Sequence, residues 1–517
     1  MENEKSGREV IVIGGGCGGL FTAALLAKKS FRVTVLEKNA AIGGGLSTFR
    51  RNGIAFQPGM HIVGGFSDKD SPRRTDGALS TNELEAHTSK INEVKSAFVE
   101  ADNPRSIETV FKELGIKAEV RDCPRRMAVL SDSSVRDIPV TKEAVVEMLG
   151  KEFPYEKAGI EAYYRRIDEI CKFRQSEMQL DGLMSADTFI EQFTSDPKLK
   201  AIFGSLNLLT GTEAGITPAL THSIINELYT RQFSYFPNGT EDIVRQLTDI
   251  IESAGGRILN KTAVSSLHFG TDDNGKRCVT AVETSDGTLH TADIYISDIP
   301  PARLAEISGE NGTFSKIQLK RITSLRDGFS MFTVYAKVRN GSPVPEGATF
   351  CFPNYDSVWR QGSIYNGDWL HGALFVRFGE QLTAMAAMPF SMVERWENGR
   401  NEEYRRWKDE QTGRILSLLN SYMSILNNHT ADQYIEAKDI TVLCSASPLS
   451  IRDWLGNRHG AAYGFSIDYQ NPLSSRLSAK TKADNLFLTG QSLFLHGLCG
   501  TVMSAVTTAR EIVTSPL

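Results

Sequence analysis

A long run of apolar and small residues follows a short polar start, and its pattern has to be interpreted first. Residues 10–27, VIVIGGGCGGLFTAALLA, carry no charge and come after Lys5 and Arg8, as in a signal peptide or a membrane span. Five glycines interrupt the centre of this run, and each weakens an isolated helix by roughly 1 kcal/mol. The pattern therefore predicts a buried strand at 10–13, a glycine turn and a helix that starts at Leu20.

The glycine turn has the spacing of a dinucleotide-binding loop. Gly14, Gly16 and Gly19 match GxGxxG, in which the glycines permit a tight turn, close approach to a pyrophosphate and close helix–strand packing. The N–H groups at the helix N-terminus would bind the phosphates. This spacing alone is weak evidence. The next apolar run, 31–39, predicts a second strand that ends near Glu37, where a carboxylate binds the ribose hydroxyls.

The pattern continues through LEKNAAIGGG at 36–45. From Val10 to Gly44 it resembles the dinucleotide fingerprint of the superfamily that contains the FAD-dependent amine oxidases and phytoene desaturases. The resemblance implies FAD as the cofactor, bound here by Gly14, Gly16, Gly19, Glu37, Lys38, Gly43 and Gly44. Many relatives have a basic residue after the glycine pair, whereas this chain has Gly45, so backbone donors have to supply more of the pyrophosphate contacts.

In this superfamily the flavin domain is discontinuous, and two later segments match its other parts. Residues 235–264 predict a turn, an amphipathic helix with Thr240 as N-cap, and a strand around Val264, which in relatives lies against the adenine end of FAD. Residues 485–513 predict a strand, a glycine-rich loop and a terminal helix that starts at about Gly500 or Thr501. The implied FAD contacts of that last segment are Gly490, Gln491, Gly500, Thr501 and Val502.

These segments define the expected architecture. The predicted fold class is α/β, with a discontinuous, Rossmann-like FAD-binding domain of the glutathione reductase type and an inserted α+β substrate domain. The FAD-binding domain is expected at 1–99, 226–300 and 436–517. The substrate domain is expected at 100–225, which has a mostly helical pattern, and at 301–435. The polar stretch 67–104 is interpreted as an insertion or a flap.

Composition and the absence of some motifs exclude several kinds of binding partner and cofactor. The net charge is −5 and no basic block occurs, so nothing indicates a nucleic acid as partner. The seven cysteines are scattered without a CxxC pair, which argues for a reducing compartment and against a zinc site or any other metal site of that kind. No second GxGxxG occurs, so a built-in NAD(P)H domain is not indicated. The resemblance therefore implies an external electron donor or acceptor.

Three motifs specify the branch of the superfamily: GIAFQPGMHIVGGF at 53–66, SPLSIRDWLGNRHGAAYGF at 447–465 and TGQSLFLHGLCGTVMSA at 489–505. They resemble the phytoene desaturases, carotenoid isomerases and, most closely, all-trans-retinol saturases. The resemblance implies an FAD-dependent oxidoreductase that acts on carbon–carbon double bonds of an apolar isoprenoid or polyene. It also implies a cytoplasmic protein with peripheral contact to the membrane that holds its substrate.

Two other functions stay open at this point. One is a flavin-dependent amine or protoporphyrinogen-type oxidase; the other is a non-catalytic prenyl-binding carrier of the GDP-dissociation inhibitor type, because fold alone does not prove an enzyme. The candidate catalytic residues are His61 and His496, which either act on substrate beside the flavin or only shape their loops. The aromatic residues Phe352, Tyr355, Trp359, Tyr365 and Trp369 either line an apolar tunnel or form ordinary core, and the core reading is favoured.

Overall fold

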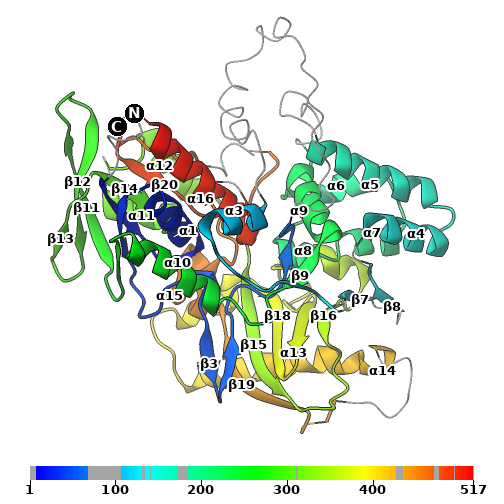
Figure 1. Cartoon of the computed structure of the whole chain (residues 1–517). Helices are drawn as coiled ribbons and strands as arrows, with labels where there is room; N and C mark the ends of the chain where they lie inside the picture. Colours follow the sequence, from blue (N-terminus) through cyan, green and yellow to red (C-terminus); the bar gives the residue numbers. More distant parts are fainter. Residues whose placement is uncertain are drawn as a thin grey trace, which may run out of the picture.

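The computed structural model describes residues 7–67, 106–124, 126–130, 134–139, 141–172, 184–309, 312–426, 435–436, 438–470, 477–493 and 495–515. The insertion or flap predicted at 67–104 lies outside the described residues, apart from Ser67. Two main sheets organise the rest (Figure 1).

The first sheet is a five-stranded parallel Rossmann sheet in the order β10-β2-β1-β14-β20. Its strands are β1 (Glu9–Ile13), β2 (Arg32–Leu36), β10 (Arg257–Leu259), β14 (Ile294–Ser297) and β20 (Leu486–Leu488). Alternation along β1 divides the core: Val10 and Val12 pack with the helices of one face, and Ile11 and Ile13 with the opposite face. The sheet therefore combines three parts of the chain that are far apart in sequence, as predicted.

Helices cover one face of this sheet, and two further helices and a smaller sheet cover the other. The first face carries α1 (Cys17–Ala27), α10 (Glu241–Ser253), α16 (Gly497–Thr514) and α3 (Ile107–Leu114), with α16 lying along α1 (Figure 1). The opposite face carries α11 (Pro301–Ser308), α12 (Lys316–Ser324) and the sheet of β11 (Val264–Thr271), β12 (Arg277–Thr284) and β13 (Leu289–His290). The predicted fold class is confirmed.

Two helices begin earlier than the sequence predicted. Helix α1 starts at Cys17 rather than Leu20, because Gly16 is extended at the N-cap and Gly18 and Gly19 then enter the first turn. Helix α16 starts at Gly497 rather than at Gly500 or Thr501. Thr240 does occupy the N-cap position of α10, but its hydroxyl donates to the Leu46 carbonyl at 2.6 Å instead of accepting from the helix.

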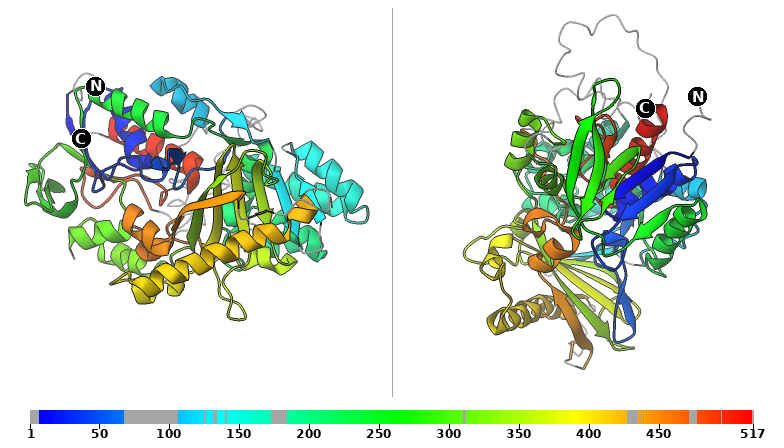
Figure 2. Two further views of the ribbon diagram at one scale, coloured as in Figure 1. Left: turned by 90° about the horizontal axis from the view of Figure 1, so that it is seen from below. Right: turned by 90° about the vertical axis from the view of Figure 1, so that its left-hand side faces the viewer.

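The second sheet has seven strands in the order β19-β15-β18-β17-β16-β7-β8, and all neighbours are antiparallel except β16 and β7. Its strands are β7 (Arg126–Leu130), β8 (Ser134–Asp137), β15 (Ser330–Val338), β16 (Gly347–Cys351), β17 (Ala373–Phe378), β18 (Gln381–Met388) and β19 (Ile440–Ala446). Helix α13 (Glu402–Ser421) runs along one face (Figure 2), followed by α14 (Met423–Leu426). The other face packs on α4 (Lys142–Glu152), α5 (Lys157–Lys172), α6 (Ala186–Glu191), α7 (Pro197–Phe203), α8 (Asn207–Thr210) and α9 (Ala219–Arg231).

Three predicted domain boundaries do not follow the sheets. Helix α3 was predicted in the substrate domain but packs in the core with α1 and α16. Helices α11 and α12 were also predicted in the substrate domain, but they pack on the opposite face of the Rossmann sheet. The segment 436–517 was assigned to the FAD-binding domain, but β19 pairs with β15 and so extends the seven-stranded sheet beyond residue 435. The described chain returns towards the Rossmann sheet through α15 (Pro448–Leu455). Short sheets connect the two parts: β3 (Phe49–Arg51) with β4 (Ile54–Phe56), and β9 (Phe233–Tyr235) with β5 (Val63–Gly64) and β6 (Arg121–Asp122).

Candidate functional site

The predicted glycine loop closes tightly around the N-terminus of α1. Gly14 has a φ of +97°, which favours glycine, and its N–H donates to the Leu36 carbonyl at 2.9 Å. A Cβ at Gly19 would lie 2.2 Å from the Gly14 carbonyl oxygen, and one at Gly15 would lie 2.6 Å from the Ile42 side chain. The loop therefore has no room for side chains where α1 packs on β1, which is the packing that GxGxxG provides.

The other predicted glycines lie against the same loop. Gly43 has a φ of +112° and donates its N–H to the Gly15 carbonyl at 2.8 Å. A Cβ at Gly44 would lie 3.1 Å from the Cα of Gly16. Gly490, which follows β20, has its Cα 2.7 Å from the Cβ position of Gly18. The structure thus brings together glycines from the first and last parts of the chain.

Glu37 is buried at the end of β2 and holds the loop by its carboxylate. It is only 6% exposed. Its Oε2 accepts the Gly15 N–H at 2.8 Å, and its Oε1 accepts the Asn39 N–H at 2.7 Å. Each carboxylate oxygen can accept a further bond, so both remain able to accept from a ribose hydroxyl.

Asp298 lies against the glycine loop, and the sequence reasoning missed it. It follows β14, and the N–H groups of Gly16 and Gly19 bond to its carboxylate. Burial raises the pKa of Asp298 to about 7, these two N–H groups lower it, and the charge of Glu37 raises it. The available signal was an acid directly after an apolar strand, YISD, because ligands of such sheets bind at the carboxyl ends of the strands.

The remaining predicted cofactor residues lie at several places. The Lys38 ammonium donates to the Asp453 carbonyl at 2.8 Å, and Val264 begins β11. Thr501 and Val502 are buried within the first turns of α16, where Val502 belongs to the core beside α1. At Gly500 a Cβ would lie 2.1 Å from the Leu495 carbonyl oxygen. Their contact with a cofactor stays a prediction.

The two candidate histidines lie in different surroundings. His61 is on the loop between β4 and β5; its buried Nε2 has no hydrogen-bond partner among the described residues, and burial lowers its pKa to about 4. His496 is the N-cap residue of α16 and lies against the Tyr463 ring, with 4.5 Å between ring centroids. His61 is therefore neutral at pH 7.

Tyr463 is at the centre of an apolar region beside the loop of α16. Its hydroxyl donates to the Leu209 carbonyl at 2.8 Å, and its ring meets Phe329 edge-on at 5.9 Å. The Tyr229 ring closes over Gly64, at 2.9 Å from a Cβ placed there. Burial raises the pKa of Tyr463 and of Tyr229, so both phenols stay neutral. No local signal in the sequence places Tyr463 beside His496.

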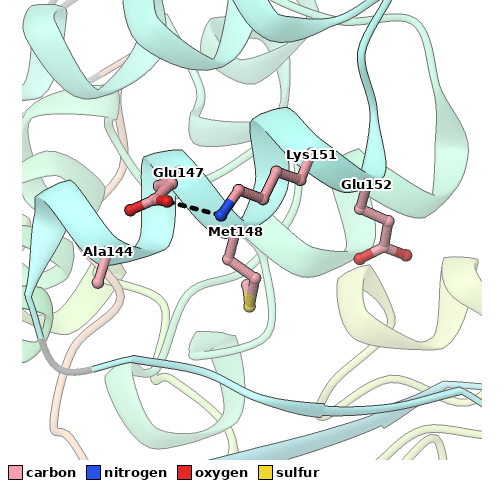
Figure 3. Close-up of a pocket in the computed structure, with 5 residues that line it drawn as sticks. All are labelled: Ala144, Glu147, Met148, Lys151 and Glu152. Carbon is pink, nitrogen blue, oxygen red and sulfur yellow. Dashed lines mark hydrogen bonds and ion pairs between the residues drawn. The ribbon is translucent and has the colours of Figure 1, made fainter.

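The aromatic residues predicted either to line a tunnel or to form core do not line one common cavity. Phe352 and Trp369 are almost completely buried, but they belong to cores on opposite faces of the seven-stranded sheet. Tyr365 is 46% exposed. A surface hollow of about 580 Å³ is lined by one stretch of α4, 144–152, where the Glu147–Lys151 ion pair is exposed (Figure 3). Because a single helix lines this hollow, it does not explain a tunnel for an apolar ligand.

The neutral state of His61 has a measurable consequence for the protein without cofactor. An unfolded histidine takes up a proton below about pH 6.5, whereas folded His61 resists it down to about pH 4. Stability should therefore fall as pH falls through this window, and His61→Leu should remove ~3 kcal/mol of that loss at the acid end. Denaturant titrations between these pH values test this, with His290→Leu as control; an unchanged acid sensitivity in His61→Leu would refute it.

Comparisons with known proteins agree with the Rossmann fold of this region. The family described as an NAD(P)-binding Rossmann-like domain matches residues 12–74. All-trans-retinol 13,14-reductase of Rattus norvegicus is 22% identical, with 98% of this chain and 85% of that protein covered. The chloroplastic prolycopene isomerase of Arabidopsis thaliana is 24% identical, with 80% of this chain and 68% of that protein covered.

Solved structures share the whole fold. An oxidoreductase of Methanosarcina mazei has a TM-score of 0.62 at 14% identity, covering 97% of this chain and 100% of its own. Putrescine oxidase bound to putrescine has a TM-score of 0.60 at 12% identity, covering 98% and 99%. Fold and glycine site thus define a Rossmann-type protein whose fold is shared with putrescine oxidase. Within that class, the chain is similar over nearly its whole length to all-trans-retinol 13,14-reductase, and over 80% of its length to prolycopene isomerase, as its motifs predicted.

Proposed function

We propose that the protein is an FAD-dependent oxidoreductase that acts on carbon–carbon double bonds of an apolar isoprenoid or polyene. The observation that carries the proposal is the intact dinucleotide site, with Glu37 buried against the glycine loop, in a chain similar throughout to a retinol reductase. The donor set fits FAD: loop N–H groups directed at an anion, and a carboxylate with free acceptor capacity at the end of β2.

When bound, FAD would supply the transfer of a hydride to or from the substrate. The role of the protein itself is to bind and orient an apolar molecule and to exclude water from it. The aromatic rings of Tyr229, Phe329 and Tyr463 supply apolar surface for that purpose. A neutral His61, with a buried Nε2 and no partner among the described residues, is the group we propose for orienting substrate or exchanging a proton. His496, beside Tyr463, is the second candidate.

The substrate comes from a membrane in this proposal, and contact with it would be peripheral in an otherwise cytoplasmic protein. The described part of the chain has no helix of the length and apolarity that crossing a bilayer requires. Fully exposed Tyr155, between α4 and α5, and exposed Ile317 on α12 are apolar side chains available for contact with lipid. An electron donor or acceptor would have to come from outside the chain.

Anaerobic incubation of the reduced holoenzyme with retinol-like and carotenoid-like polyenes in vesicles tests the proposal. A product heavier by two hydrogens is expected, because the motifs are most similar to those of saturases. The oxidised enzyme tests desaturation, as a loss of two hydrogens, and an unchanged mass with altered double-bond geometry means isomerisation. Mass spectrometry and chromatography read the result. Peroxide release with simple amines, or a colourless protein that binds a prenyl group, would contradict the proposal.

A further inference from the structure

The Asp298 side chain lies between two loops that contain glycine: the GxGxxG loop after β1 and the loop after β20 that contains Gly490. Its Oδ1 lies 2.4 Å from the Cβ position of Gly18 and 2.6 Å from that of Gly490. Its Oδ2 lies 2.5 Å from the Cβ position of Gly16. These three positions lack side chains, so the carboxyl group can reach the N-terminus of α1 only because they are glycines.

We propose that Asp298 is a binding residue for the dinucleotide and that it acts as the neutral carboxylic acid, donating a hydrogen bond from its O–H to a pyrophosphate oxygen. FAD binding at alkaline pH is then coupled to the uptake of one proton from solvent. This inference rests on the proposed function, because it needs FAD as the ligand. It assigns to this side chain a role that the glycine motif itself does not require.

The first argument is competition for the same donors. The N–H groups of Gly16 and Gly19 bond to the Asp298 carboxylate. In a GxGxxG loop these are the groups at the helix N-terminus that are available to a pyrophosphate. An ionised Asp298 would oppose a second anion at these donors, whereas a protonated one can give up its N–H partners and become a donor itself.

The second argument is the charge around Asp298. The titratable groups that face it are Glu37 from β2, which raises its pKa, and the thiol of Cys17 from α1. Burial and the charge of Asp298 raise the pKa of Cys17, so this thiol stays neutral. No lysine or arginine among the described residues forms an ion pair with Asp298. Without a cation, a pyrophosphate next to Asp298 adds negative charge and shifts the carboxyl further towards its neutral form.

The third argument is the protonation state of Asp298 before FAD binds. Burial, more than any neighbour, raises the pKa of Asp298 to about 7, so half of the free protein already carries the acid near neutral pH. Binding below this pH needs no proton uptake. Above it, each pH unit should weaken the apparent affinity for FAD about tenfold, until the complex itself loses the proton.

The test compares the wild type with Asp298→Asn, whose amide is neutral at every pH and can donate a hydrogen bond in place of the acid. Apoprotein is titrated with FAD from about pH 6 to about pH 9, read by flavin fluorescence. Wild-type affinity should fall about 100-fold over this range, and that of Asp298→Asn should stay constant within about threefold. Asp249→Asn, an exposed acid on α10, should keep the wild-type slope.

Calorimetric titration in two buffers of different ionisation heat gives a second readout that needs no variant. The wild type should take up about one proton per FAD near pH 8.5. A pH-independent wild-type affinity, a proton count near zero, or an Asp298→Asn protein with the wild-type slope would each overturn the inference while leaving the FAD assignment intact. If neither protein binds FAD at any of these pH values, the proposed function itself fails.

Discussion

Glu37→Arg should purify without yellow colour and should bind added FAD at least about 100-fold more weakly than the wild type. The Glu37 side chain is 6% exposed, and its carboxylate accepts the N–H groups of Gly15 and Asn39. Arginine has no acceptor, so both N–H groups lose their partner and a guanidinium enters a buried position. The substitution thereby damages the glycine loop as well as the ribose contact.

Two further variants distinguish loss of the ribose contact of Glu37 from damage to the fold. Glu37→Gln keeps the shape and one acceptor oxygen, and a loss of about tenfold is expected. Glu252→Arg makes the same charge change at an exposed position on α10 and should keep its flavin. Flavin absorbance relative to protein absorbance after purification gives the loading, and circular dichroism checks the fold. A fully loaded Glu37→Arg protein would show that this end of β2 does not bind the cofactor.

The first part of the fold was predictable because its signals are local. The change from the apolar run at 10–13 to glycines and then to small apolar residues fits only a strand, a turn and a helix. Val10 and Val12 face the helices while Ile11 and Ile13 face away, so every residue of the run is buried, as expected for a central parallel strand. The downstream acid at Glu37 completes the fingerprint within 30 residues of Gly14.

Asp298 shows what the sequence leaves open: its signal places an acid at the carboxyl end of a strand, but not beside the glycine loop. It reaches Gly16 only because β14 pairs with β1, with Val10 opposite Ile294. Strand order is a property of long-range packing, and nothing in the segment YISDIP states which strand lies beside it. The same limit holds for Tyr463 and His496, which meet through a loop and the start of α16.

The misplaced boundary at 435 has a related cause. Strand β19 is an edge strand with two exposed residues and little alternation, so its pattern does not indicate the sheet to which it belongs. In the folded chain, β19 pairs with β15, with Tyr335 opposite Cys444, and this pairing places β19 in the seven-stranded sheet. Order in the sequence suggested a return to the flavin domain, while the hydrogen bonds keep this strand in the seven-stranded sheet.

The second large effect is expected at the third glycine of the fingerprint. In Gly19→Ala the new Cβ would lie 2.2 Å from the carbonyl oxygen of Gly14, a backbone atom that cannot rotate away. Helix α1 must then move off β1, and the N–H of Gly19 moves with it. We expect a loss of about 3 kcal/mol in the free energy of unfolding, together with loss of FAD loading.

Gly413→Ala is the matched control, since it makes the same chemical change inside a helix. Gly413 lies in α13, exposed, and a Cβ there has no neighbour within 4 Å. Alanine should therefore stabilise the protein, by about 0.5–1 kcal/mol, because it costs less backbone entropy than glycine. Denaturant titration and flavin loading measure both variants. A Gly19→Ala protein that is stabilised like Gly413→Ala and keeps its flavin would show that the close packing of α1 on the dinucleotide loop does not require glycine at position 19.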